Sequence, residues 1–123
     1  MSKILKINNK MKNVDIKRGE VWFGSLPQVA GSIQYGARPL LVISNDYCNK
    51  YSSVITVIPL TSVNKKKNQP THIFIKHIDL KTSIVMCEQI ITIPKNMLNN
   101  KICDIDRKDM LRIERGIKIQ VGI

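Results

Sequence analysis

Short β-prone segments, each ended by proline or by turn-forming residues, constrain the fold of this chain more than any other feature. The segments are rich in Val, Ile, Phe and Trp, which favour strands. Pro27, Pro59 and Pro94 each follow one segment and are expected to end it, because proline cannot donate a hydrogen bond to a β-ladder. The predicted strands are Val21–Phe23, Leu40–Ser44, Val54–Ile58, His72–Lys76, Ser83–Cys87 and Ile90–Ile93, with Ile102–Ile105 as a candidate further strand.

A helix is predicted near the C-terminus. Asp106 is suited to accept amide protons as the N-cap, and Asp109 places a carboxylate near the positive end of the helix. The residues that share its apolar face at helical spacing are Met110, Ile113 and Ile117. Gly116 costs this helix roughly 1 kcal/mol relative to alanine. Residues 117–121 also alternate like a strand, so the sequence leaves the last boundary open.

These elements predict a mainly β chain: a compact barrel of five or six short strands, with the C-terminal helix on its outside. Ser44-Asn-Asp46 has turn chemistry and is able to cap a short helical turn as far as Asn49. Residues 16–123 are expected to form one domain. Residues 1–15 are expected to be a flexible basic tail, either a solvated extension or an electrostatic arm for a polyanion.

The charge balance points to anionic partners. Twenty basic and nine acidic residues give a net charge of +11, which suits RNA, DNA, an anionic membrane or an acidic protein. Cys48, Cys87 and Cys103 form no CxxC pair, so a zinc knuckle is not indicated and free thiols in a reducing compartment are expected. The N-terminus lacks the apolar stretch of a signal peptide, and no run reaches the length of a membrane span. A soluble cytoplasmic protein is the resulting expectation.

A glycine-flanked loop leads directly into one of the predicted strands. Gly31 and Gly36 bracket small and polar residues, and the loop ends at Arg38, which Pro39 holds in an extended conformation. An arginine at the start of a rigid strand suits phosphate binding, because guanidinium presents a planar fork of donors to anionic oxygens.

Six motifs occur in order and together resemble the MazF/PemK toxins of bacterial toxin–antitoxin systems. The motifs are Arg18-Gly-Glu-Val-Trp22, Gly31-Ser-x-Gln-x-Gly-x-Arg-Pro39, Ser44-Asn-Asp46, Pro59-Leu-Thr-Ser62, Pro70-Thr-His72 and Cys87-Glu-Gln-Ile90. The resemblance runs from about Ile16 to Ile123. It implies an SH3-like barrel of the PemK/MazF/CcdB type and a homodimer. It also implies an endoribonuclease that cuts single-stranded RNA without a metal or other cofactor and is inhibited by an acidic antitoxin.

The resemblance also assigns site residues. The key arginine and threonine of the family fall on Arg38 and Thr61, which are therefore the expected catalytic residues. The family pattern also predicts which residues contact RNA: Ser32, Gln34, Tyr35, Glu88 and Gln89. Lys65 and Lys66, in a basic loop beside such a site, are expected to follow RNA phosphates. Ile33 departs from the family, which commonly has an acidic residue there, and this change is expected to alter base preference.

The residue types suit such chemistry, although less specifically. RNA can be cut by its own 2′-hydroxyl, so an enzyme has to align that nucleophile and stabilise the charge that develops. Arg38 supplies a positive charge, and Thr61 supplies a hydroxyl for a phosphate oxygen or the 2′-hydroxyl. No close Asp/Glu/His cluster in the sequence suggests a two-metal nuclease. His72 lies on an alternating strand and is interpreted as structural, and the sequence assigns no general acid or base.

Three other functions stay open at this point. The first is a non-enzymatic toxin on the same barrel that poisons a protein such as DNA gyrase. The second is a nucleic-acid-binding barrel whose site has lost activity. The third, a membrane-active basic protein, is the weakest because no strongly amphipathic basic helix is evident.

Overall fold

The computed structural model describes residues 15–28, 31, 33–63 and 69–123. Apart from Asp15, the predicted N-terminal tail lies outside the described residues. The strands are β1 (Glu20–Leu26), β2 (Gly36–Val42), β3 (Val54–Ser62), β4 (His72–His77), β5 (Leu80–Met86), β6 (Ile91–Pro94) and β7 (Leu98–Asp104). The helices are α2 (Asp46–Tyr51) and α3 (Arg107–Val121), with single 3₁₀ turns η1 (Cys87–Gln89) and η2 (Lys95–Met97).

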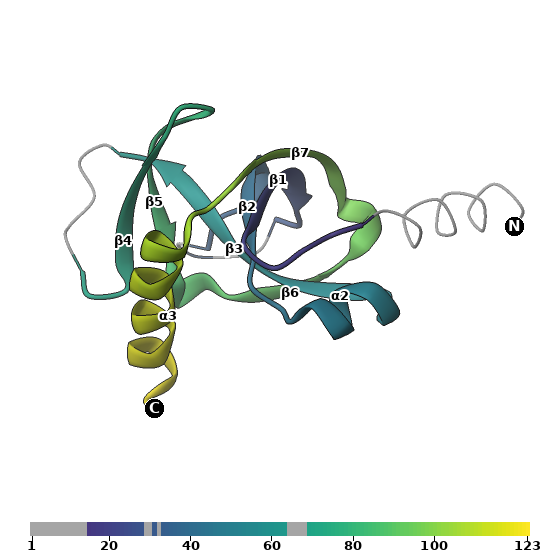
Figure 1. Cartoon of the computed structure of the whole chain (residues 1–123). Helices are drawn as coiled ribbons and strands as arrows, with labels where there is room; N and C mark the ends of the chain where they lie inside the picture. The colour runs from purple at the N-terminus through teal and green to yellow at the C-terminus, as the bar shows by residue number, and fades with distance from the viewer. Residues whose placement is uncertain (1–14, 29–30, 32, 64–68) are drawn as a thin grey trace, which may run out of the picture.

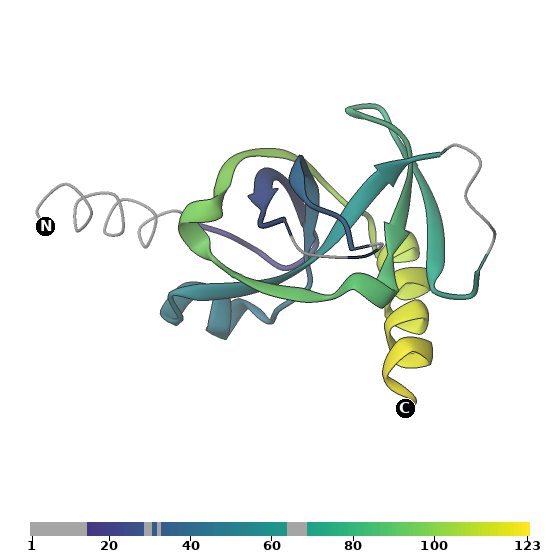
Figure 2. The same cartoon turned by 180° about the vertical axis from the view of Figure 1, so that it is seen from behind.

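The strands form one antiparallel sheet that bends around a core. Their order is β4-β5-β3-β2-β1-β7, and β6 pairs with β3 outside this path. Figures 1 and 2 show α3 beside the β4–β5 hairpin and α2 towards the opposite end of the molecule. The expected class, mainly β with a C-terminal helix, is confirmed.

Strand β3 is shared by three partners. It pairs with β6 over Val54–Val57, with β2 over Val57–Pro59 and with β5 over Leu60–Ser62. The prediction that Pro59 ends this strand is wrong. At residue 59 the β6 pairing has already ended and the β5 pairing has not begun. The sheet therefore requires no hydrogen bond from residue 59 on that side, and proline, which has no N–H, is tolerated there.

Other strand boundaries also differ from the prediction. Strand β2 begins at Gly36 and so includes Arg38, and β7 begins at Leu98, four residues before the expected position. Strand β1 does end before Pro27. Helix α3 extends through Val121, which resolves the open boundary in favour of a helix.

The helix ends follow from local chemistry. The Asp106 carboxylate accepts from the Asp109 amide at 2.8 Å, as the N-cap prediction requires. Gly122 ends α3 with a φ of 78°, a left-handed conformation that glycine adopts without a side-chain penalty. The predicted short helical turn is α2, capped by the Asn45 side chain.

Two buried clusters occupy opposite faces of the β2–β3 pair. Leu40 and Val57 belong to one cluster, whereas Leu41 and Ile58 belong to the other. Burial on both faces explains why the sequence of β2 is a continuous apolar run without alternation. Trp22 lies in the first cluster with 7% of its surface exposed, so it is a core residue.

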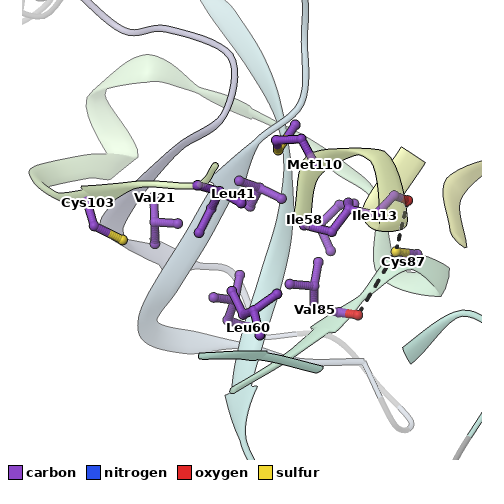
Figure 3. Close-up of a cluster of buried hydrophobic side chains, with 11 residues drawn as sticks. Val21, Leu41, Ile58, Leu60, Val85, Cys87, Cys103, Met110 and Ile113 are labelled. Atoms are coloured by element: carbon purple, nitrogen blue, oxygen red, sulfur yellow. Dashed lines mark hydrogen bonds between the residues drawn. The ribbon is translucent and has the colours of Figure 1, made fainter. Parts of the chain in front are cut away.

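Figure 3 shows the second cluster, in which Met110 and Ile113 of α3 cover Ile58 and Val85 of the sheet. The Cys87 thiol lies within it, 3.7 Å from the Ile113 carbonyl oxygen. Burial, followed by the nearby Glu88 carboxylate, raises the pKa of Cys87 to about 12, so this thiol is unreactive at neutral pH. All three cysteines are free, as expected.

Gly116 is required where α3 approaches the sheet. A Cβ at this position would lie 2.9 Å from Cys87 Sγ and 3.2 Å from Ile73 Cγ1. The helix-weakening glycine found in the sequence therefore permits close packing of α3 on η1 and β4.

Gly116→Ala tests this close approach. Alanine favours the helix by about 1 kcal/mol, but overpacking a filled core costs about 1–3 kcal/mol, so we expect a net loss of roughly 1 kcal/mol. Urea unfolding measures the change, with Gln120→Ala on the exposed part of α3 as the control. A Gly116→Ala protein more stable than the parent would show that α3 does not pack this closely.

Candidate active site

Arg38 lies on β2 with its guanidinium tethered to the backbone. Its Nε donates to the Tyr35 carbonyl at 3.1 Å, and Nη1 lies 3.5 Å from the Leu60 carbonyl of β3. Partial burial lowers the pKa of Arg38, while the nearby Tyr35 raises it. Arginine titrates so far above neutral pH that the charge remains. The Arg38 guanidinium is therefore a cation that is held in place by hydrogen bonds and partly removed from solvent.

Thr61 lies on the neighbouring strand β3. The β2–β3 pairing ends at Leu40 and Pro59, and Arg38 and Thr61 each lie two residues beyond this last pair. Both residues line one pocket of about 520 Å³. Its other lining residues are Phe23, Ala37, Pro39, Leu60, Ser62, Asp79, Leu80, Lys81, Ser83 and Ile102. We call it the Arg38–Thr61 pocket.

A second, smaller pocket of about 280 Å³ holds three of the other predicted contacts. Gln34, Glu88 and Gln89 line it, together with apolar side chains of Leu26, Ile33, Pro59, Ile90 and Ile91. The backbone N–H of Gln34 donates to Gln89 Oε1 at 2.7 Å, and this hydrogen bond ties the loop to η1. We call it the Glu88 pocket.

The two pockets are joined by residues 34–38. Gln34 is bound to η1 at the Glu88 pocket, and the Tyr35 carbonyl accepts from Arg38 at the other pocket. Tyr35 itself is 49% exposed. The structure therefore brings Arg38 together with Thr61, and Gln34 together with Glu88 and Gln89. Ser32, Lys65 and Lys66 lie outside the described residues.

Within residues 15–28, 31, 33–63 and 69–123, no three His, Cys, Asp or Glu side chains gather as a metal-binding group. Within those same ranges, no helix is both long and apolar enough to cross a membrane.

Comparison with known proteins identifies the family. Residues 17–121 match the family described as "PemK-like, MazF-like toxin of type II toxin-antitoxin system". The chain belongs to this family. The family assignment drawn from the six motifs is therefore confirmed.

Individual relatives of this PemK/MazF-type toxin agree over most of its length. "Endoribonuclease EndoA" of Bacillus subtilis (strain 168) is 37% identical over 114 residues, covering 88% of this chain and 96% of the relative. MazF from Deinococcus radiodurans (Form-I) superposes with a TM-score of 0.79 at 16% identity, covering 90% of this chain and 100% of that one. A mycobacterial structure, "Endoribonuclease in complex with its cognate antitoxin", superposes with a TM-score of 0.74 at 23% identity, covering 88% of this chain and 96% of that one. The two structures support the fold.

The Arg18-Gly-Glu-Val-Trp motif of this toxin is structural. The carboxylate of Glu20 is buried, and its Oε1 accepts from Trp22 Nε1 at 3.0 Å and from the Lys17 amide at 2.8 Å. Its Oε2 pairs with Lys101 Nζ of β7 at 2.9 Å. The Glu20 hydrogen bond, followed by that of Asp104, raises the pKa of Lys101. One carboxylate therefore fastens β1 to β7.

Some residues that line the pockets of this toxin were not predicted. Asp79, Lys81 and Ser83 join the Arg38–Thr61 pocket because β5 pairs with the end of β3, a non-local contact that no motif signals. His72, predicted to be structural, is buried and bonded to Glu88.

Glu20→Gln tests the structural role of the first motif. The amide would direct donors at Lys101, and a mispaired buried group costs on the order of 1–3 kcal/mol. We expect the urea midpoint to fall while activity per folded molecule is retained. Asp104→Asn, which alters only the exposed partner of Lys101, should change the midpoint much less. Loss of activity with unchanged stability would instead assign Glu20 to the active site.

Proposed function

We propose that this toxin is a metal-independent, sequence-selective endoribonuclease that cuts single-stranded RNA in the Arg38–Thr61 pocket and so arrests growth. The observation that carries the proposal is the placement of a tethered cation and a hydroxyl, from neighbouring strands, in one pocket. The Bacillus subtilis relative, named an endoribonuclease, favours this activity over a gyrase poison on the same barrel.

The reaction needs no external nucleophile. The ribose 2′-oxygen attacks the adjacent phosphorus, the P–O5′ bond breaks, and the 2′-proton leaves as the 5′-oxygen gains one. The products are a 2′,3′-cyclic phosphate and a 5′-hydroxyl. Negative charge grows on the non-bridging oxygens during attack, and a preorganised guanidinium in a partly desolvated site stabilises it. Arg38 is suited to this role because two backbone carbonyls already fix its orientation.

Thr61 complements the arginine. Its hydroxyl is able to donate to a non-bridging oxygen or to orient the 2′-hydroxyl, since a threonine hydroxyl both donates and accepts. Asp79 and Lys81 line the same pocket and add ionisable groups of both signs near the reacting phosphate.

The remaining assignments follow the same hypothesis. Gln34, Tyr35, Glu88 and Gln89 contact the RNA beside the scissile phosphate, and the Glu88 pocket lies where a neighbouring nucleotide would rest. Ser32, Lys65 and Lys66 are assigned to RNA binding from the sequence alone. Residues 16–123 form the toxin domain, and residues 1–15 a basic tail.

We also propose that two copies of the chain act as a homodimer and that an acidic antitoxin blocks the RNA site. A net charge of +11 suits both a polyanionic substrate and an acidic inhibitor. The mycobacterial structure includes an antitoxin, which supports this pairing by analogy. Cleavage of transcripts places the protein in the cytoplasm.

Arg38→Ala and Thr61→Val test the site. We expect Arg38→Ala to lower kcat/KM by about 10²–10³-fold in EDTA, because a charge-stabilising donor is lost, and Thr61→Val to lower it less. The double variant should lose less than the product of the two effects, because both groups act on one phosphate.

Arg107→Ala is the matched control, since it removes the same charge from an exposed position at the start of α3. Thermal unfolding confirms that each variant is folded. Cleavage at the parent rate by folded Arg38→Ala protein would refute the assignment.

A further inference from the structure

The Arg38–Thr61 pocket has three ionisable side chains among its described lining residues: Arg38, Asp79 and Lys81. Cleavage by the 2′-hydroxyl is faster when one group accepts a proton and another donates one. Arg38 is unsuited to both tasks, because guanidinium has no acceptor atom and keeps its protons in proteins. Of the described ionisable groups in this pocket, Asp79 and Lys81 are therefore the ones able to move protons.

The β4–β5 hairpin brings both side chains to the pocket (Figure 1). His77 pairs with Leu80, so Ile78 and Asp79 form a two-residue turn between the strands. The Asp79 backbone N–H donates to His77 Nδ1 at 3.0 Å, and this hydrogen bond fixes the turn. The turn and the first residues of β5 therefore place a carboxylate and an ammonium group, Asp79 and Lys81, at one wall of the pocket.

The backbone that carries Lys81 is anchored to the strand that carries Thr61. Ser83 Oγ donates to the Lys81 carbonyl at 2.7 Å, which holds this part of β5 in place. The Val63 N–H donates to the Thr82 carbonyl at 3.2 Å, at the point where β5 meets the end of β3. These contacts fix the position of the Lys81 backbone relative to the Thr61 hydroxyl.

The Asp79 carboxylate remains available to a substrate. Its Oδ2 lies 3.9 Å from His77 Nδ1, but this nitrogen accepts the Asp79 N–H and so has no proton to donate to the carboxylate. Burial, followed by the nearby Asp79 carboxylate, raises the pKa of the Cys103 thiol on β7. The charge of Asp79 therefore acts as far as β7, which supplies Ile102 to the pocket wall.

A carboxylate and an ammonium group suit different atoms of the RNA. The carboxylate is repelled by the non-bridging phosphate oxygens, so its favourable position is beside the ribose hydroxyl, whose proton it is able to accept. The ammonium group is attracted to the phosphate and has protons to donate, so it suits the departing 5′-oxygen. Arg38 then keeps the role of stabilising the charge on the phosphate.

We propose that Asp79 is the general base of the cleavage reaction and Lys81 its general acid. This assignment rests on the proposed function and supplies the proton transfers that the reaction requires. As the 2′-oxygen bonds to phosphorus, its proton passes to an Asp79 carboxylate oxygen. As the P–O5′ bond breaks, the Lys81 ammonium group gives a proton to the 5′-oxygen. Water then returns the proton from Asp79 to Lys81, so both residues end in their starting forms.

An RNA with sulfur in place of the bridging 5′-oxygen separates the two roles. Its leaving group is a thiolate, which departs without a proton, whereas attack by the 2′-hydroxyl still benefits from a base. We expect Lys81→Arg, which keeps the charge but holds its protons, to lower kcat on ordinary RNA by about 10²-fold. On the sulfur substrate this variant should come within about threefold of the parent, because no acid is needed. Asp79→Asn should lower kcat by about 10²-fold on both substrates.

Matched controls and a binding measurement exclude indirect effects. Lys118→Arg and Asp15→Asn make the same changes at exposed positions outside the described pocket lining, and both should keep the parent rate. Affinity for a 2′-fluoro RNA, which lacks the nucleophile and is not cut, should not fall in Lys81→Arg or Asp79→Asn. A residue needed only for binding or folding would instead lower this affinity or the thermal midpoint.

Two results overturn the assignment while the nuclease stands. One is a parent-like kcat for folded Asp79→Asn and Lys81→Arg proteins on ordinary RNA. The other is a Lys81→Arg defect that persists on the sulfur substrate, or an Asp79→Asn defect that disappears on it. Failure of the proposed function looks different: the parent protein itself would leave ordinary RNA intact, and the acid–base assignment would fall with it.

Discussion

The antiparallel pairing of β2 with β3 is the constraint on which the site depends. Leu41 and its partner Ile58 belong to one buried cluster, and Val42 and its partner Val57 belong to the other. A slip of one residue would exchange the side chains of the two clusters, so burial on both faces fixes the register strongly. Arg38 and Thr61 lie just beyond the end of this register and line one pocket. Packing of the apolar half of the strands therefore determines the geometry of their polar ends.

Under the proposed function, separate pockets serve the reacting phosphate and a neighbouring nucleotide. The Arg38–Thr61 pocket offers a cation and a hydroxyl, which suit a phosphate. The Glu88 pocket offers apolar walls and a carboxylate, which suit a base edge. Residues 34–38 connect the two pockets, so under the proposed function this segment would align the neighbouring nucleotide with the phosphate. Alignment of this kind is a large part of what catalysis by a 2′-hydroxyl requires.

Local chemistry in the sequence predicted much of the fold. The apolar segments marked the strands, Asp106 marked the start of α3, and the six motifs marked the family. The error at Pro59 has a non-local cause, because β3 continues through this residue where its partner strands change. The boundary that the sequence left open, at residues 117–121, is helical in the structure. The sequence could name Arg38 and Thr61 but not Asp79, Lys81 or Ser83 beside them, since β5 reaches that pocket only through its pairing with β3.

The central claim is that Arg38 and Thr61 hold a phosphate for attack by its own ribose. The most direct test is mass spectrometry of the fragment ends that the protein releases from a long RNA in EDTA. The account predicts upstream fragments ending in a 2′,3′-cyclic phosphate, or in the phosphate to which it hydrolyses, and downstream fragments beginning with a 5′-hydroxyl. Fragments with a free 3′-hydroxyl and a 5′-phosphate would show that water was the nucleophile, and would contradict the account.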